Sequence, residues 1–332
     1  MTVLAGAAPL PRRALTDIFA APHDDPARGF ADATKTGDPV DIALPPLRMG
    51  AHLLPLLAPH PLPADVRWDE PSFRSMIPWV CTFHDAGVHG DGGIVTGAGC
   101  VVSDTLVHVA PIRQGFAELD SRIVLLGTAA PTPLAGTWLS LLCGSHWNHY
   151  HWLIDGIGRL AAADKATLER CDGVLLPANL SPTAAHTVHL SGVTRGRQVL
   201  EVQPNDSVNV PRLVVPWRIS DGFWPHPALR SFLAGLLPET ARNPAFPPRI
   251  YIDRRGAHNR RLTNEDDVID ALASAGVVPI RLEALSFTAQ VALFRQAELV
   301  VGPHGAGLAN LAFAPPSCAA VALALERRAA RR

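Results

Sequence analysis

Short apolar runs and helical apolar spacing alternate through the last third of the chain. The runs at 249–252, 277–280 and 299–301 have the length of buried strands and are bounded by polar or turn residues. Between them, apolar residues recur at helical spacing after Asn264 and after Ser286, and both residue types favour the position just before a helix. This alternation with short loops predicts a parallel sheet of the Rossmann type.

The helix expected after Asn264 carries signals at both of its ends. Acidic residues occupy its first turn, where carboxylates suit the positive end of the helix dipole, and Gly276 ends it. The first-turn residues are Glu265, Asp266 and Asp267, and the apolar face consists of Val268, Ile269, Leu272 and Ala275. Further on, we expect a helix at 307–313 and a strand at 319–325.

The pattern before residue 249 is less regular. Residues 1–75 are rich in proline, alanine and aspartate and show little periodicity, and we expect the start of this segment to be poorly ordered. Short β-prone runs at 93–96 and 100–102 lie between glycines and predict a β-hairpin or small meander. A long helix is expected from near Asn148 through Leu160. The pattern also predicts strands at 123–126, 174–176 and 213–215, and helices at 181–190 and 228–237.

The proline distribution indicates how the chain divides. The 31 prolines are concentrated in the first 75 residues and around 204–248, and a length of 332 residues suits two domains. We therefore expect an N-terminal segment at 1–75, an N-terminal domain at 76–240 and a C-terminal domain at 241–332.

Composition narrows the classes of partner. With 29 basic and 30 acidic residues the formal net charge is −1, which argues against nucleic acid or an anionic membrane as a partner. The sequence has no signal-peptide pattern and no run of 18 apolar residues, so we expect no transmembrane segment and leave peripheral membrane contact open. The five cysteines are widely spaced without a CxxC pair, which is typical of reduced thiols in a cytoplasmic protein.

A glycine-rich loop follows the apolar run at 299–301. A helix that starts after a buried strand presents free N–H groups and a partial positive charge, which suit a phosphate or diphosphate. Gly305 and Gly307 allow the backbone to approach such a ligand, and His304 can donate to a phosphate oxygen or a sugar hydroxyl. The glycine spacing differs from that of dinucleotide-binding loops. A tight turn with a hydrogen-bonded histidine is the alternative.

Basic side chains follow the run at 249–252, at the same expected edge of the sheet. They are Arg254, Arg255, His258, Arg260 and Arg261. Arginine forks at this edge can neutralise a diphosphate leaving group. The alternative is a solvated loop.

His151 and Asp155 are one helical turn apart and share one helix face. A carboxylate beside an imidazole can act as a general base. The alternative is an ion pair between Asp155 and Arg159 beside a packed His151. Metal-binding residue types also gather here, although their spacing fits no zinc motif: Cys143, His146, His149, His151 and Asp155. The GxSxG and Walker A patterns are absent, which excludes the corresponding hydrolase and P-loop classes.

Taken together, three stretches resemble glycosyltransferase family 61. Residues 148–160 are similar to its Tyr-His-Trp-Leu, Asp, Pro-Arg-Leu motif, with Gly158 where proline is usual. Residues 299–316 are similar to its HGAGL-N-F motif, and residues 251–265 look like its arginine-rich turn. The order and approximate separation also match, and the likeness covers about residues 80–325.

The resemblance implies a GT-B architecture, in which two Rossmann-like domains face a cleft and the C-terminal one holds the donor. It implies inverting transfer from a nucleotide sugar, typically a UDP-sugar, to a glycan or other hydroxyl acceptor, without a metal or other cofactor. In bacterial relatives the products tend to be capsular or other surface polysaccharides. By this resemblance the donor-facing residues would be Arg254, Arg261, His304, Gly305, Ala306, Gly307 and Asn310, and the catalytic residues would be His151 and Asp155.

The end of the chain departs from the family pattern. The family's usual strand-ending glutamate would fall near Ala322, whereas Glu326 comes about four residues later and the chain stops at Arg332. We therefore expect a truncated C-terminal domain. The alternatives are a nucleotide- or glycan-binding protein with an incomplete donor domain that has lost catalysis, and a zinc enzyme built on residues 143–155.

Overall fold

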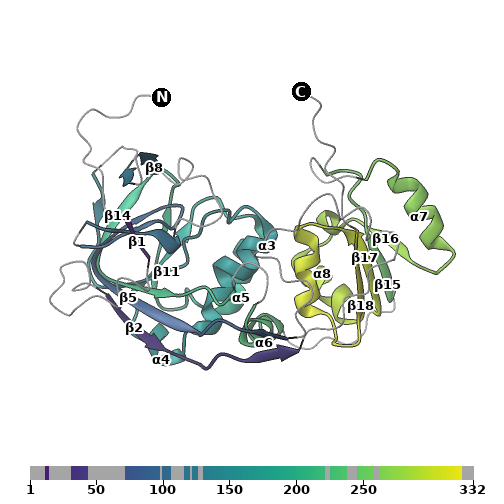
Figure 1. Cartoon of the computed structure of the whole chain (residues 1–332), viewed down its shortest axis with the longest axis horizontal. Helices are drawn as coiled ribbons and strands as arrows, with labels where there is room; N and C mark the ends of the chain where they lie inside the picture. Colours follow the sequence, from purple (N-terminus) through teal and green to yellow (C-terminus); the bar gives the residue numbers. More distant parts are fainter. Residues whose placement is uncertain are drawn as a thin grey trace.

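The structure is a computed structural model of the chain. It describes residues 12–14, 31–43, 72–97, 99–105, 116–119, 122–125, 130–220, 225–237, 245–257 and 262–323. Two sheets with associated helices lie side by side, the larger one built from the N-terminal part of the chain and the smaller one from the C-terminal part (Figure 1). This is a mixed α/β fold, which confirms the predicted class at that level.

The larger sheet contains ten strands in the described part of the chain. They are β1 (Arg12–Arg13), β2 (Ala31–Lys35), β5 (Trp79–His89), β6 (Ile94–Val95), β7 (Val101–Val102), β10 (Thr132–Pro133), β11 (Thr137–Ser140), β12 (Gly173–Pro177), β13 (Gln198–Val202) and β14 (Ser207–Pro216). The order β13-β12-β11-β14 is parallel throughout, whereas β5 pairs antiparallel with β14, β2 and β6. The sheet is therefore mixed and not parallel throughout.

Several sequence predictions for this half are confirmed. The expected hairpin at 93–102 is the antiparallel pair β6–β7, in which Val95 lies opposite Val101. The expected strands at 174–176 and 213–215 lie within β12 and β14, and the strand at 123–126 corresponds to β9 (Arg122–Leu125), which pairs with β8 (Phe116–Leu119).

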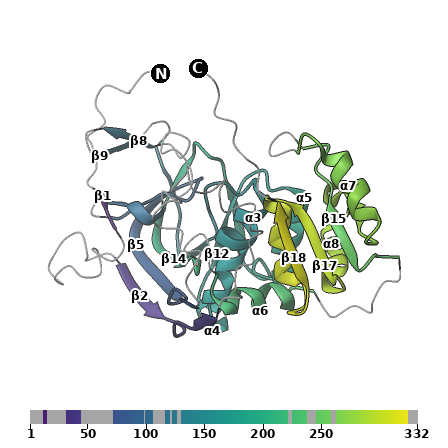
Figure 2. The same cartoon turned by 45° about the vertical axis from the view of Figure 1, so that its right-hand side comes forward.

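Parts of the segment 1–75, whose sequence shows little periodicity, form strands. The expected poorly ordered start, before Arg12, lies outside the described residues. Residues 31–35 form β2, which pairs along the curved strand β5, and β3 (Asp41–Ala43) pairs with β4 (Ser72–Arg74) (Figure 2). The edge of β5 supplies the hydrogen-bonding partners of β2 from a distant part of the chain. A local sequence pattern does not contain that information.

One irregular helical segment connects β11 to β12 where a single helix is expected. It consists of α3 (His149–His151), the wider π-helical turn η3 (Trp152–Gly156) and the 3₁₀ helix η4 (Ile157–Ala162). Asn148 caps the start, because its side-chain oxygen accepts a hydrogen bond from the backbone N of Tyr150 at 3.0 Å. Single π turns inside helices occur frequently at functional sites.

Gly158 is required by the packing of this segment. A Cβ atom at this position would lie 2.2 Å from the carbonyl oxygen of Leu153 and 2.4 Å from a methyl group of Leu229. Neither proline, the usual residue of the family motif, nor alanine fits this backbone.

Three further helices of this half lie within the described part of the chain. They are α4 (Lys165–Glu169), α5 (Pro182–Ser191) and α6 (Pro227–Gly235). Helices α5 and α6 confirm the predictions at 181–190 and 228–237. Ser181 caps α5 by accepting from the backbone N of Ala184, and His226 caps α6 by accepting from that of Ala228.

The smaller sheet has four parallel strands in the order β16-β15-β17-β18. They are β15 (Arg249–Ile252), β16 (Val278–Ile280), β17 (Leu299–Pro303) and β18 (Ala319–Leu323). The chain runs from β15 outward to β16 and then crosses back to β17, so the strand order reverses between β15 and β17. In parallel sheets, ligands bind beyond the carboxyl ends of the strands at such a reversal.

Helices cover both faces of this sheet, as Figure 1 shows for α7 (Glu265–Ala273) and α8 (Phe287–Arg295). Tyr251 packs with the apolar face of α7, whereas Ile250 and Ile252 belong to the core that contains α8. These neighbours alternate between the faces because successive side chains of a strand point to opposite sides. The expected strands and helices of this half are thus confirmed. The helix expected at 307–313 is the 3₁₀ helix η6 (Ala306–Phe313).

Two details at the ends of these helices differ from prediction. Asn264 occupies the N-cap position of α7, but its side chain makes no capping hydrogen bond. Ala275 lies beyond the last residue of α7 and is exposed, so it is not part of the apolar face. The predicted caps are confirmed at Ser286, which accepts from the backbone N of Ala289, and at Gly276, which has a φ of 70°.

A continuous apolar core joins the two halves. Trp152 and Leu153 of η3 belong to the same buried cluster as Phe287 of α8 and Phe313 of η6. Arg295 adds two hydrogen bonds across this junction, from Nη2 to the carbonyl oxygens of Ala234 and Leu237. Among the described residues, none forms a helix with the length and apolarity needed to cross a membrane.

Candidate active site

Two of the predicted donor-binding residues meet at the strand-order reversal of the smaller sheet. Arg254 follows β15 and Gly305 follows β17, and these two strands are paired neighbours. A Cβ atom on Gly305 would lie 2.8 Å from Nη1 of Arg254, so the guanidinium lies directly over the glycine backbone. We call this place, between Arg254 and the loop 302–307, the crevice.

The loop packs closely against β15, and its glycines permit that approach. A Cβ atom on Gly302 would lie 2.9 Å from Cβ of Ile252, and one on Gly307 would lie 3.0 Å from a methyl group of Leu282. Ala306, which lies within the loop, is the first residue of η6, and His304 is exposed. The start of a helix and the Arg254 guanidinium therefore border the crevice.

A buried carboxylate anchors Arg254. Glu265 is 4% exposed, and its Oε1 accepts hydrogen bonds from the backbone N of Arg254 at 2.7 Å and from the Tyr251 hydroxyl at 3.0 Å. Burial, together with this hydrogen bond, raises the pKa of Tyr251 above its usual range. From the sequence we assigned Glu265 only to the helix dipole, whereas the structure shows that it fixes the turn that carries Arg254.

The neighbouring arginine has a different environment. Arg255 Nη2 pairs with Asp253 Oδ2 at 2.8 Å, and its Nη1 pairs with Asp266 at 2.9 Å. Hydrogen bonds from Arg255 are the main cause that lowers the pKa of Asp253 to about 2. Arg255 is thus held by two carboxylates, which compete with an anionic ligand for its guanidinium.

Other members of the basic cluster lie outside the described residues. They are His258, Arg260 and Arg261, of which Arg261 is a predicted donor-binding residue. Glu326 also lies outside the described residues.

Asn310 lies at the junction between the two halves. It is fully buried, and its Nδ2 donates to Oε1 of Gln290 at 2.8 Å while its Oδ1 contacts Nε2 of His149 at 2.8 Å. Gln290 Nε2 donates to the carbonyl of Leu282, so its amide oxygen is the group that accepts from Asn310. The oxygen of Asn310 then faces His149, which must donate through Nε2.

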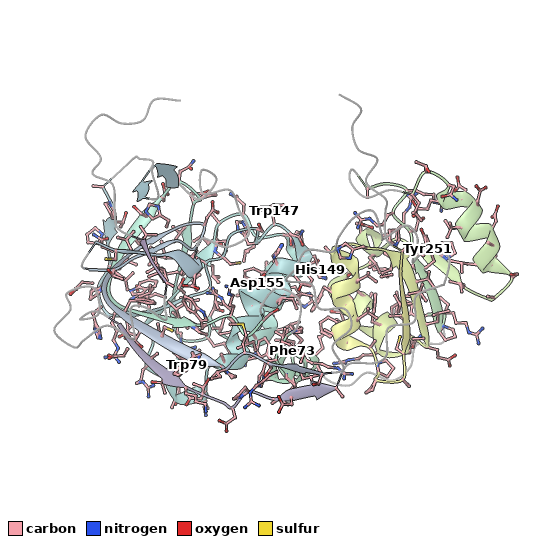
Figure 3. All side chains as sticks on the ribbon, viewed as in Figure 1. Phe73, Trp79, Trp147, His149, Asp155 and Tyr251 are labelled. Atoms are coloured by element: carbon pink, nitrogen blue, oxygen red, sulfur yellow. The ribbon has the colours of Figure 1, made fainter. Side chains whose placement is uncertain are left out.

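His149 is the residue of α3 that contacts the C-terminal half. Figure 3 shows His149 on the side of the helical segment toward that half and Asp155 on the side toward the larger sheet. Burial lowers the pKa of His149, so burial favours its neutral form. From the sequence, His149 was a candidate only as a metal ligand. Its contact with Asn310 spans 161 residues along the chain and leaves no local signal.

The predicted contact between His151 and Asp155 is formed. His151 Nδ1 lies 2.8 Å from Oδ2 of Asp155, and both side chains are mostly buried. Arg159 does not form the alternative ion pair with Asp155. Its Nη2 donates to the carbonyl oxygens of Ser140 at 3.1 Å and Leu142 at 3.0 Å.

The residues considered for zinc do not converge. No group of three or more metal-binding side chains is found among the residues that the structure describes. His149 and His151 have the separate partners given above. Cys143 is buried, and burial raises the pKa of its thiol to about 12, which disfavours the thiolate that binds zinc.

Comparison with known families agrees with this geometry. The Glycosyltransferase 61 family model matches residues 149–321, which is more than half of the chain. The match includes the helical segment with His151 and Asp155, the turn with Arg254 and the glycine loop. No curated protein matches the chain. The fold defines an α/β protein whose candidate site lies beyond the carboxyl ends of parallel strands. The chain belongs to glycosyltransferase family 61 and is a glycosyltransferase.

Proposed function

We propose that the protein transfers a sugar from a nucleotide sugar, a UDP-sugar, to a hydroxyl group of a glycan or another acceptor, with inversion at the anomeric carbon. The observation that carries this proposal is the close approach of Arg254 to Gly305 at the strand-order reversal of the smaller sheet. This position combines a guanidinium with a glycine loop that leads into a helix, and both favour a diphosphate.

In the proposed reaction, the acceptor oxygen attacks the anomeric carbon from the face opposite the diphosphate. The new C–O bond forms while the bond from that carbon to the phosphate oxygen breaks, and its electron pair leaves with the nucleoside diphosphate. Arg254, the His304 side chain and the N–H groups of Ala306 and Gly307 stabilise that charge. Asp155, oriented by His151, takes the proton of the acceptor hydroxyl. In this proposal, Arg254, His304 and the two N–H groups stabilise the negative charge of the leaving diphosphate without a bound metal.

The proposed division of labour is that of a GT-B enzyme, with the acceptor at the N-terminal domain of residues 76–240 and the donor at the C-terminal domain of residues 241–332. The parallel block β13-β12-β11-β14 and the parallel sheet β16-β15-β17-β18 support this division. The likeness to bacterial family members favours a surface or capsular polysaccharide as the product. The five free cysteines are consistent with a cytoplasmic enzyme.

Calorimetry with UDP and UDP-sugars, followed by a UDP-release assay, tests this function. Binding together with UDP release in the presence of an acceptor is the expected result. Binding without release would favour the alternative, a nucleotide-binding protein that has lost catalysis. Absence of binding would contradict both functions.

A further inference from the structure

A pocket in the N-terminal half lies beyond the carboxyl ends of β11 and β14, which are neighbouring parallel strands. Its polar lining includes Asp155 and Arg159 from the helical segment, Arg218 after β14, and Asp104 from the 3₁₀ turn η1 (Ser103–Thr105). Trp217 and other apolar side chains form the rest of its wall. The end of a parallel strand pair is a common place for a ligand.

Three buried side-chain atoms from the residues that line this pocket have no hydrogen-bond partner. They are Oδ1 of Asp155, Nε of Arg159 and Nε of Arg218. The Arg159 side chain is 8% exposed, and its Nη2 is already committed to backbone carbonyl oxygens. Since buried polar groups are nearly always hydrogen-bonded, the convergence of three such atoms indicates that a polar ligand completes the pocket.

The charged side chains that line the pocket favour an uncharged polar ligand over an ion. Arg159 and Arg218 offer N–H donors, whereas the carboxylates of Asp104 and Asp155 offer acceptors, and the four formal charges sum to zero. An anion would meet two carboxylates here, and a cation would meet two guanidinium groups. A hydroxyl group both accepts and donates a hydrogen bond, so a pair of hydroxyl groups matches this lining without adding charge.

The size and apolar wall of the pocket narrow the ligand further. Its volume of about 60 Å³ holds a few water molecules, which is room for one edge of a sugar ring and too little for a nucleotide. Ile94, Leu142, Val215 and Trp217 give it an apolar side that can pack against the C–H groups of a ring.

We propose that this pocket binds the hydroxyl edge of an uncharged acceptor sugar, with Arg159 and Arg218 donating to its hydroxyl oxygens and Asp155 accepting from the hydroxyl that reacts. This assignment rests on the proposed glycosyl transfer and names the acceptor class of the same site. Arg218 is the specificity-determining residue in this arrangement, because its buried Nε has no hydrogen-bond partner within the protein and lies in the pocket lining.

Binding of methyl glycosides of neutral hexoses and pentoses, measured by saturation-transfer NMR on the full chain, tests the proposal. Arg218→Gln is expected to weaken that binding by about 10-fold to 100-fold, because it removes hydrogen bonds from a charged donor. Arg212→Gln is the matched control, since Arg212 is an exposed residue of β14, the strand that precedes Arg218, and does not line the pocket. Affinity for UDP, measured by calorimetry, should be the same in both variants.

A second variant distinguishes a loss of glycoside binding from a folding defect. Arg218→Lys keeps the charge but not the Nε–H group, so we expect a loss of glycoside affinity with an unchanged thermal melting curve. Three results would overturn the proposal: no glycoside binds the wild-type chain, Arg218→Gln leaves the affinity unchanged, or glycosides of hexuronic acids bind more tightly than neutral ones. A wild-type chain that binds glycosides but not UDP would instead contradict the proposed donor function.

Discussion

The crevice and the pocket occupy equivalent places in two sheets but differ in their chemistry. Each lies beyond the carboxyl ends of two neighbouring parallel strands, β15 and β17 for the crevice and β11 and β14 for the pocket. The crevice presents the Arg254 guanidinium beside a glycine loop, whereas the pocket balances two arginines with two aspartates. The same position in a sheet thus suits a diphosphate in one case and hydroxyl groups in the other, according to the side chains around it.

The two places also hold their arginines differently. Arg254 is fixed through its backbone by the buried carboxylate of Glu265. Arg159 is fixed through its guanidinium by the carbonyl oxygens of Ser140 and Leu142. The guanidinium of Arg159 is therefore held in place before a ligand arrives.

The largest expected effect is that of removing the proposed base in the pocket. It should slow catalysis without changing nucleotide binding in the crevice. Asp155→Asn should lower kcat by about 10²–10⁴-fold, because the amide cannot take the proton of the acceptor hydroxyl. UDP affinity should not change, since Asp155 is not part of the crevice. Steady-state kinetics and calorimetry measure the two quantities, and Asp206→Asn in an exposed turn is the control.

The same experiment decides between the two members of the pair. Full activity of Asp155→Asn with an inactive His151→Ala would assign the base to His151. If both variants kept full activity, the assignment of this pair as the base would be wrong.

A substitution in the crevice should have the opposite effect: it should weaken donor binding and leave acceptor binding unchanged. Arg254→Gln should weaken UDP-sugar binding by about 10-fold to 100-fold, the range for hydrogen bonds to a charged group, while glycoside binding in the pocket stays the same. Arg255→Gln is the informative comparison, because Arg255 is already paired with Asp253 and Asp266 and should contribute much less. Equal losses of calorimetric affinity in the two variants would show that the crevice does not distinguish these arginines.

Stability should respond to the helical segment that borders the pocket. Gly158→Ala is expected to lower the free energy of unfolding by about 1–3 kcal/mol, because the new methyl group overlaps Leu153 and Leu229. Gly235→Ala is the control, since that glycine is exposed and has no atom near its Cβ position. Urea denaturation measures both, and an unchanged Gly158→Ala variant would mean that the segment can shift to make room.

The smallest expected effect concerns the junction. Burial keeps the pKa of His149 below its usual value, so as pH falls below about 6.5 the unfolded chain takes up a proton that the folded chain does not. Stability should therefore decrease with acidification below this pH and should not depend on His149 at higher pH. His149→Gln, which can still donate to Asn310, should make the urea midpoint less sensitive to acid. The urea midpoint of this variant should still fall somewhat with acidification because of His89, whose pKa is lowered to about 4 by burial.

Local sequence patterns were sufficient to predict the strands and helices of the C-terminal half. The strands β15 to β18 and the helices α7 and α8 each follow from apolar spacing and from start or stop residues within the element itself. The meeting of Arg254 with Gly305 also followed, because the ends of neighbouring parallel strands share one edge of the sheet.

Long-range contacts account for most of what the sequence did not reveal. The edge pairing of β2 with β5 and the hydrogen bond between His149 and Asn310 join residues far apart in the chain. Arg218 carries no motif, and its role depends on a pocket formed by β14, η1 and the helical segment. The contact of His151 with Asp155 was predictable because both belong to one turn of helix.

The hydrogen bonds from His149 through Asn310 to Gln290 have a consequence for protein engineering. Under the proposed division of labour, exchanging the C-terminal half between family members would change the transferred sugar. In this chain such a chimera would replace Asn310 and Gln290 while keeping His149, and a single mismatched partner would leave a buried polar group unsatisfied. Grafts that carry this three-residue set together with the apolar core around Trp152 and Phe313 are therefore the ones expected to yield soluble hybrids.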